Sequence, residues 1–250
     1  MGERAVRICQ LDGSLPNLAL MRLSDWHRAR SDNIHFFRGA DAVERKMFEP
    51  QYERVYASAI FKFSKPLINA FRAQWPEAIL GGTGTTETTT VEQIIGDHDG
   101  LDYSLQPAFK ASIGFTQRGC RLSCKFCVVP TKEGKNRSTS TIAAIWRGDP
   151  YPRWLHLLDN DFFGQEQWRE RIAEIRDGQF KVCFSQGINV RAMTPETAAA
   201  IATTEYRDDQ FQRRRLYTAW DNLKDEEIFL KALICLKLPV CLHHISWPTC

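Results

Sequence analysis

The sequence lacks several features that would place the protein in a broad class at once. Its most apolar late segment, residues 229–242, is interrupted by two lysines and a proline and is too short to span a bilayer, so no membrane partner is expected. The first seven residues lack the apolar core of a secretion signal, which favours a cytoplasmic protein with reduced thiols. Charge of one sign is not in excess: 33 Lys and Arg against 30 Asp and Glu give a net charge of +3, so a nucleic-acid partner is not indicated.

The composition is that of a globular protein, because 43% of the 250 residues are hydrophobic and can fill a core. The first hundred residues alternate between short apolar runs and segments of helical periodicity, which predicts a Rossmann-like doubly wound domain over residues 1–100. Residues 81–84, Gly-Gly-Thr-Gly, fit either a phosphate-binding turn or a plain turn at a strand exit, and residues 85–106 have the composition of a linker. We expect strands at 6–11, 34–37, 55–61 and 78–80, and helices at 17–30 and 66–74.

A second alternation occupies residues 101–250. Strand–helix units of roughly 30 residues are the building blocks of (β/α) barrels, but only four strands are convincing here. We therefore expect an α/β fold in which a Rossmann-like domain precedes a partial, truncated (β/α) barrel. The expected strands are 111–115, 154–158, 181–184 and 216–219, and the expected helices are 140–146, 166–176, 195–203 and 225–236.

Three of the eight cysteines lie in one short loop directly after the first strand of this second half. Spacings of four and then three let one loop aim the thiolates of Cys120, Cys124 and Cys127 inward, as metal ions and iron–sulfur clusters require. Three thiolates on a four-iron cluster leave one iron open to a further ligand. The alternative is a structural zinc site closed by a distant fourth thiol such as Cys183.

With the aromatic residue Phe126 directly before the last cysteine, this loop resembles that of the radical S-adenosylmethionine (radical SAM) superfamily. The resemblance implies that Cys120, Cys124 and Cys127 hold a [4Fe–4S] cluster, that its open iron chelates S-adenosylmethionine, and that Phe126 flanks the adenine ring. It also implies an electron donor such as a flavodoxin or ferredoxin, reductive cleavage of S-adenosylmethionine, and a 5′-deoxyadenosyl radical that acts on a substrate the sequence does not identify. No catalytic residue beyond the cofactor site is assigned.

Polar residues follow the second expected strand of the barrel. The resemblance places Asp159, Asn160 and Asp161 near the amino group of the methionine moiety, although the Gly-Gly-Glu usual in the family is absent here. Asp161 is equally suited to cap a helix that begins near Gln165.

Polar residues also follow the third strand. A glycine turn here carries two carboxamides and a guanidinium, from Gln186, Asn189 and Arg191. These groups suit hydrogen bonds to ribose hydroxyls and to the cofactor carboxylate. The alternative is that they only form hydrogen bonds within the loop. A similar polar segment, Trp-Asp-Asn at residues 220–222, directly follows the fourth expected strand. It is a further candidate for substrate or cofactor contact.

The first half resembles the cobalamin-binding-type domain that precedes many radical SAM barrels. That family usually carries Asp-x-His-x-x-Gly after its first strand, whereas residues 10–15 here read Gln-Leu-Asp-Gly-Ser-Leu, without the axial histidine. Cobalamin is therefore not expected. The order of the two domains is the one feature that suggests methyl or methylthio transfer.

The last 16 residues change character, with three cysteines and two histidines whose spacing fits no standard ligand pattern. A zinc or auxiliary-cluster site there competes with an altered or truncated C-terminus, which we prefer. The second hypothesis for the whole chain is accordingly a non-catalytic or truncated iron–sulfur or zinc-binding module. The residues concerned are Cys235, Cys241, His243, His244 and Cys250.

Overall fold

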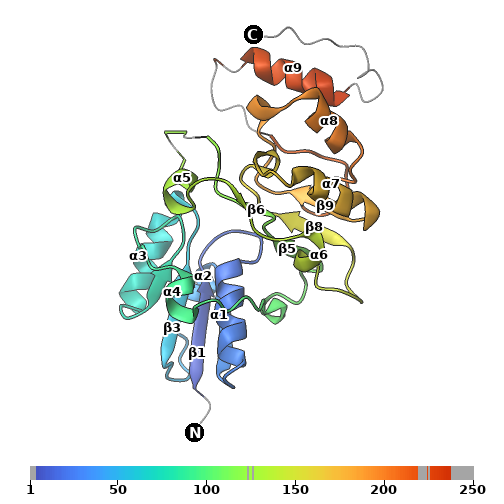
Figure 1. Ribbon diagram of the computed structural model, residues 1–250. Coiled ribbons are helices and arrows are strands. Elements are labelled where there is room, and N and C mark those ends of the chain that lie inside the picture. Colours follow the sequence, from blue (N-terminus) through green and yellow to red (C-terminus); the bar gives the residue numbers. More distant parts are fainter. Residues whose placement is uncertain (1–3, 123, 126, 219–223, 225, 238–250) are drawn as a thin grey trace. The chain divides into compact units, whose positions relative to one another are not determined.

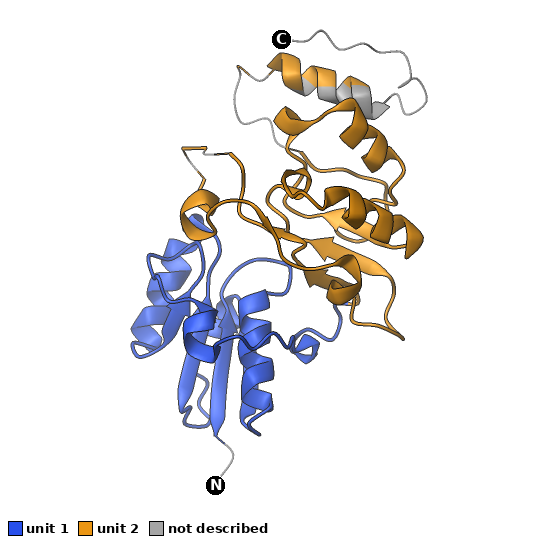
Figure 2. Ribbon diagram, in the orientation of Figure 1, with its two compact units in different colours: residues 1–109 blue, residues 110–250 orange. Residues whose placement is uncertain are grey.

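The structure is a computed structural model that describes residues 4–122, 124–125, 127–218, 224 and 226–237. The chain divides into two compact units, Met1–Phe109 and Lys110–Cys250 (Figure 2). Both units combine parallel strands with helices (Figure 1). Among the described residues, no helix has both the length and the apolar character that crossing a bilayer requires.

The first unit is built on a four-stranded parallel sheet of strand order β2-β1-β3-β4. The two central strands, β1 and β3, are almost entirely buried, as expected for strands covered by helices on both faces. The chain runs outward from β1 to β2 and from β3 to β4, so the direction of winding reverses between β1 and β3. The strands are β1 (Ala5–Gln10), β2 (Asn33–Arg38), β3 (Arg54–Ser58) and β4 (Ile79–Gly81).

The helices of the first unit begin where the sequence signals predict. The Asn17 side chain accepts a hydrogen bond from the Leu20 backbone N–H at 3.2 Å and caps the first helix, whose Leu20 and Leu23 side chains are buried against the sheet. Pro66 occupies the first turn of α3, where its missing N–H costs no hydrogen bond. The helical elements are α1 (Leu18–Arg28), α2 (Ala40–Val43), η1 (Lys62–Ser64), α3 (Lys65–Gln74), α4 (Val91–Ile95) and η2 (Tyr103–Leu105).

The segment predicted to be a linker is instead part of the first unit. Residues 85–106 contain α4 and η2, and Ile95 is buried in the same apolar cluster as the strand residues Val6 and Ile8. The buried carboxylate of Asp102 accepts hydrogen bonds from the Ser24 hydroxyl and from Arg28. The prediction failed because it relied on composition alone, whereas polar side chains here fasten the segment to α1.

The Gly81–Gly84 segment is a turn packed against its own unit. Gly82 has a φ of +100°, and a Cβ there would lie 2.1 Å from the Ala59 carbonyl oxygen. The Gly84 N–H donates to that same oxygen at 2.9 Å. The glycines therefore allow close approach of two backbones, which favours the strand-exit turn over a phosphate-binding loop.

Arg7 places a fully buried cation in the central strand β1. Its guanidinium pairs with the buried Glu49 carboxylate and donates to the carbonyl oxygens of Ala42 and Glu44 at 3.2 and 3.0 Å. The ring of Phe37 lies over the guanidinium at 3.7 Å. These contacts fasten the segment between α2 and β3 to the sheet.

The second unit contains a three-stranded parallel sheet of order β5-β8-β9 and a separate two-stranded antiparallel ribbon, β6-β7. Successive parallel strands are joined by helices, as in a barrel. The strands are β5 (Ser112–Gly114), β6 (Gln117–Arg118), β7 (Arg137–Ser138), β8 (Trp154–Leu157) and β9 (Lys181–Phe184). The helical elements are α5 (Val129–Lys132), α6 (Ile142–Ile145), η3 (Phe162–Gly164), α7 (Trp168–Asp177), η4 (Val190–Ala192), α8 (Pro195–Ala202) and α9 (Glu226–Lys237).

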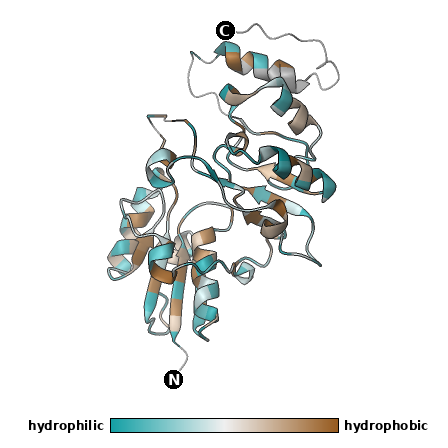
Figure 3. Cartoon of the chain, viewed as in Figure 1, coloured by the Kyte–Doolittle hydropathy of each residue, from teal (hydrophilic) through white to brown (hydrophobic). Residues whose placement is uncertain are grey.

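One face of the three-stranded sheet carries the core of the second unit. Leu155 and Leu157 of β8 lie in one apolar cluster with Ile172 and Ile175 of α7. The rest of α7 is largely hydrophilic (Figure 3), so this helix covers the sheet with a single apolar stripe. Burial on this scale fixes β8 and β9, and with them the loops at their carboxyl ends.

The fourth barrel strand predicted at residues 216–219 is wrong. The position beside β9 is taken by Tyr206, which forms a parallel bridge with Val182, while Thr218 makes only an isolated bridge with Ile188. Residue 219 lies outside the described part of the chain. The segment around Tyr206 is short and flanked by charged residues, so no apolar run marked it. The predicted fold class, a Rossmann-like domain followed by a partial (β/α) barrel, is confirmed.

Candidate functional site

The three cysteines of the loop between β6 and α5 are half-buried free thiols. The loop turns back on itself, because the Cys127 backbone N–H donates to the Cys124 carbonyl oxygen at 3.0 Å. It begins one residue after β6, whose pairing with β7 anchors its base. Phe126, expected beside the adenine ring, lies outside the described residues.

Each of the three sulfurs accepts a hydrogen bond. The Leu122 backbone N–H donates to Cys120 Sγ at 3.4 Å, and the Val129 backbone N–H donates to Cys127 Sγ at 3.5 Å. Cys124 Sγ accepts from Arg191 Nη2 at 3.2 Å. Donors directed at sulfur stabilise thiolates and are among the groups that tune iron–sulfur clusters.

The chemistry of the donor set, three thiols in one loop, fits an iron–sulfur cluster. Among the described residues, no group of three or more His, Cys, Asp or Glu side chains is gathered closely enough to hold a single metal ion. A four-iron cluster engages each thiolate through a different iron, so its sulfurs lie farther apart than those around one zinc ion. Burial raises the pKa of Cys120, and the negative charges of Asp161, Cys127 and Cys124 raise it further, a repulsion that a bound cationic iron core relieves.

The zinc alternative required a distant fourth thiol such as Cys183, whose own surroundings disfavour metal binding. Cys183 is fully buried within β9, where it accepts a hydrogen bond from the Ser185 hydroxyl at 3.7 Å. Burial raises the pKa of its thiol to about 11, so it is held in the neutral form that binds metal poorly.

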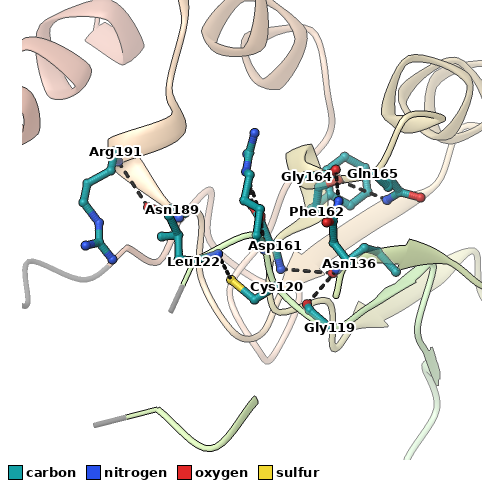
Figure 4. A network of polar contacts seen from close by, with 12 residues as sticks. Gly119, Cys120, Leu122, Asn136, Asp161, Phe162, Gly164, Gln165, Asn189 and Arg191 are labelled. Carbon is teal, nitrogen blue, oxygen red and sulfur yellow. Dashed lines mark hydrogen bonds and ion pairs between the residues drawn. The ribbon is translucent and has the colours of Figure 1, made fainter. Parts of the chain in front are cut away.

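An arginine and a carboxylate fasten the cysteine loop to the exit of β8. Asp161, whose side chain is almost fully buried, accepts hydrogen bonds from Arg121 Nε at 2.8 Å and Nη2 at 3.1 Å. Arg121 is the residue after Cys120, so this bidentate pair joins the start of the cysteine loop to the strand exit that carries Asp161. Cys120 and Asp161 are both labelled in Figure 4. Asp161 precedes η3 without a side-chain cap, and α7 begins only at Trp168, so the helix-capping alternative is not what the structure shows.

Asp159 is a second buried carboxylate at the exit of β8. Its Oδ1 accepts from the backbone N–H groups of Thr116 and Gln117 at 2.7 and 3.1 Å, and its Oδ2 accepts from the Thr116 hydroxyl. Burial outweighs these three donors and raises the pKa of Asp159 from 3.8 to about 6. Asp159 therefore joins the exits of β5 and β8 and is protonated in mildly acidic solution.

The buried Asp159 predicts a specific dependence of stability on pH. Because its folded-state pKa is raised, the folded protein binds more protons than the unfolded chain between about pH 4 and 6, and this contribution to stability falls as pH rises. A shift of about two units corresponds to about 3 kcal/mol. We expect Asp159→Asn to remove this slope, so the free energy of unfolding of the variant relative to wild type should rise by about 2 kcal/mol from pH 4 to pH 7.

Urea denaturation of both proteins across that range measures the difference directly. The comparison has to be with wild type at each pH, because buried His156, with its pKa lowered to about 4, gives an opposite slope over the same range. A variant-minus-wild-type difference that does not change with pH would contradict the assignment.

The three polar residues predicted to follow the third strand, now β9, have different contacts. Arg191 donates to Cys124 Sγ in the cysteine loop. Asn189 Oδ1 accepts the Arg191 backbone N–H at 3.2 Å and shapes the turn of η4 (Figure 4). Gln186 is exposed beside this turn. Asn160 donates from Nδ2 to Glu133 Oε2 at 3.1 Å. Whether Asn160, Gln186 and Asn189 contact a cofactor stays a prediction, and residues 220–222 lie outside the described part of the chain.

Glu133 is a site residue that the sequence did not reveal. Besides Asn160 it accepts the Gly119 backbone N–H at 3.0 Å and pairs with Arg118 at 3.1 Å. It thereby ties the start of the cysteine loop to its end, since it directly follows α5. Its only signal was a lone acidic residue within the basic run 132–137, which is more typical of a solvated surface.

In the first unit, the loop after β1 is closed against the loop after β3. Asp12 Oδ1 accepts from the Ile60 backbone N–H at 2.7 Å, and Oδ2 accepts from the Phe61 N–H at 3.0 Å. This contact lies at the point where the winding of the sheet reverses, the usual ligand position of such sheets. The assignment of this unit as a cobalamin-binding-type domain stays a prediction.

No family model matches the sequence, and no curated protein matches it. Among solved structures, the chain is similar to the radical S-adenosylmethionine methyltransferase TsrM from Kitasatospora setae, which was solved with tryptophan substrate and the S-adenosylmethionine analogue aza-SAM bound. The TM-score is 0.55 at 11% sequence identity, over 95% of this chain and 66% of that chain. The present chain thus spans about two thirds of that structure, and the likeness shows a shared fold.

Proposed function

We propose that the protein is a radical SAM enzyme, in which Cys120, Cys124 and Cys127 bind a [4Fe–4S] cluster that leaves one iron for S-adenosylmethionine. The observation that carries the proposal is the set of three half-buried free thiols in one loop, each accepting a hydrogen bond at sulfur. Three thiolates suit an open cluster, and within the described part of the chain no fourth ligand closes the site. The fold shared with a radical SAM methyltransferase supports the same conclusion.

When bound, the cluster supplies the electron that splits S-adenosylmethionine into methionine and a 5′-deoxyadenosyl radical. The residues of this chain position it. The Arg121–Asp161 pair and Glu133 fix the ends of the loop against the exit of β8. Phe126, Asn160, Gln186 and Asn189 are the proposed contacts to the adenosyl and methionine parts, together with backbone groups of the β8 exit.

Methyl or methylthio transfer is the reaction class we propose, with an electron donor such as a flavodoxin or ferredoxin. The order of the two units suggests it, and the similar structure is named as a methyltransferase. The competing hypothesis is a binding module that assembles a cluster without turnover.

Product analysis of the anaerobically reconstituted full chain separates these functions. With S-adenosylmethionine and dithionite, we expect 5′-deoxyadenosine and methionine to accumulate, and neither to form when dithionite is omitted. S-adenosylhomocysteine as the only product would identify methyl transfer without reductive cleavage. A fully assembled cluster with no cofactor-derived product under any of these conditions would contradict an enzymatic role and favour the binding module.

A further inference from the structure

One cysteine of the loop differs from the other two in the donor at its sulfur. Cys120 and Cys127 accept neutral backbone N–H groups of residues two positions along the chain. Cys124 accepts a guanidinium N–H from Arg191, which is 67 positions away, at 3.2 Å. Hydrogen bonds from a charged donor are stronger than neutral ones, and Arg191 brings a positive charge against one ligand sulfur.

The turn that carries Arg191 is held by close backbone packing and hydrogen bonds. Gly187 has a φ of +78°, and a Cβ there would lie 3.1 Å from the Tyr217 carbonyl oxygen, so the chain packs tightly at this point. The Ile188 N–H donates to that same carbonyl at 2.8 Å, and the Asn189 side chain then accepts the Arg191 N–H. Val190 is buried beneath the turn. The backbone of Arg191 is therefore held in place by groups that do not depend on Cys124.

We propose that Arg191 is a positioning residue that holds the Cys124 thiolate and raises the reduction potential of the cluster. The proposal rests on the proposed function, because it concerns the cluster held by the same cysteines. Reduction adds one negative charge to the cluster, and a cation hydrogen-bonded to a ligand sulfur stabilises the reduced form more than the oxidised form. Arg191 is itself exposed, so its effect is screened by salt.

The test is a redox titration of the reconstituted full chain followed by electron paramagnetic resonance, on wild type, Arg191→Gln and Arg191→Lys. We expect Arg191→Gln to bind as much iron and sulfide as wild type and to have a more negative midpoint potential. Arg191→Lys should lie between them, because it keeps the charge without the planar fork. Raising the salt concentration should lower the wild-type potential towards that of Arg191→Gln.

Arg169→Gln is the matched control. It removes the same charge from the same unit, but Arg169 is exposed on α7 and pairs with Glu196 at 2.7 Å. Its potential should equal that of wild type. If Arg169→Gln shifts the potential as much as Arg191→Gln, net charge is the cause and the proposal is wrong.

The outcomes separate this proposal from the proposed function. A wild-type protein that assembles no iron–sulfur cluster overturns the proposed function and this inference with it. A wild-type cluster whose potential is unchanged in Arg191→Gln overturns only the inference. Loss of the cluster in both Arg191→Gln and Arg191→Lys also overturns it, because Arg191 would then be needed for the loop to fold and not for its potential.

Discussion

Replacement of Cys124 by alanine is expected to abolish the iron–sulfur cluster and all reductive cleavage of S-adenosylmethionine. Two thiolates would remain, and two of the four irons would then lack a protein ligand. The loss of cluster should be larger than for substitution of any residue that only contacts the loop, such as Arg191, because Cys124 is itself a ligand. Iron and acid-labile sulfide per chain after anaerobic reconstitution, with the absorbance of the cluster, measure the effect.

Cys183→Ala is the matched control for this experiment. It removes a thiol from the same unit, but this thiol is fully buried in β9, where its hydrogen-bond partner is Ser185. We expect it to retain the cluster at a modest cost in stability. Retention of the cluster by Cys124→Ala would refute the ligand assignment. Loss of metal in both variants would favour the alternative hypothesis of a closed zinc site with four cysteine ligands.

Glu49→Ala is expected to destabilise the first unit by about 3 kcal/mol, the largest stability effect of any single change considered. Glu49 is the carboxylate partner of Arg7, which is fully buried in β1. Removing it leaves a buried guanidinium without a counter-charge, a situation that costs about 3–5 kcal/mol in proteins. The carbonyl oxygens and the Phe37 ring around Arg7 keep the cost near the lower end. Chemical denaturation of the full chain, with fluorescence and circular dichroism as probes, gives the change in free energy of unfolding.

Glu53→Ala provides the comparison, because it removes the same side chain from an ion pair in solvent. Glu53 is 48% exposed and lies 3.4 Å from Arg4. Such surface pairs contribute about 0–1 kcal/mol. Equal destabilisation by Glu49→Ala and Glu53→Ala would show that burial of Arg7 does not set the cost.

Much of the fold could be predicted because most of the strands are short segments rich in apolar residues. The segments 6–11 and 181–184 became β1 and β9, since strands buried on both faces are built mainly from apolar side chains. The buried Arg7 and Gln10 of β1 depart from that pattern. The bridge at Tyr206 could not be predicted, because a single pairing residue between charged neighbours carries no periodic signal. The segment at 85–106 was misjudged because polar side chains such as Asp102, not apolar ones, hold much of it in place.

The site was predictable to the extent that it is local in sequence. The spacing of the three cysteines indicated a cluster because one loop contains all of them. The contacts of Arg191 with Cys124 and of Arg121 with Asp161 join residues 67 and 40 positions apart, so they depend on how the strand exits meet. Asp161 was expected at the cofactor by analogy, and that role stays a prediction; its side chain accepts hydrogen bonds from Arg121, the residue after the first cysteine.

The central claim is that three cysteines hold a cluster with one iron open to S-adenosylmethionine. Mössbauer spectroscopy of the protein reconstituted with ⁵⁷Fe, before and after addition of S-adenosylmethionine, tests it most directly. We predict about four iron and four sulfide per chain, with about one iron in four changing its signal when the cofactor is added. Zinc without labile sulfide, or a cluster whose iron signals are unchanged by S-adenosylmethionine, would contradict the account.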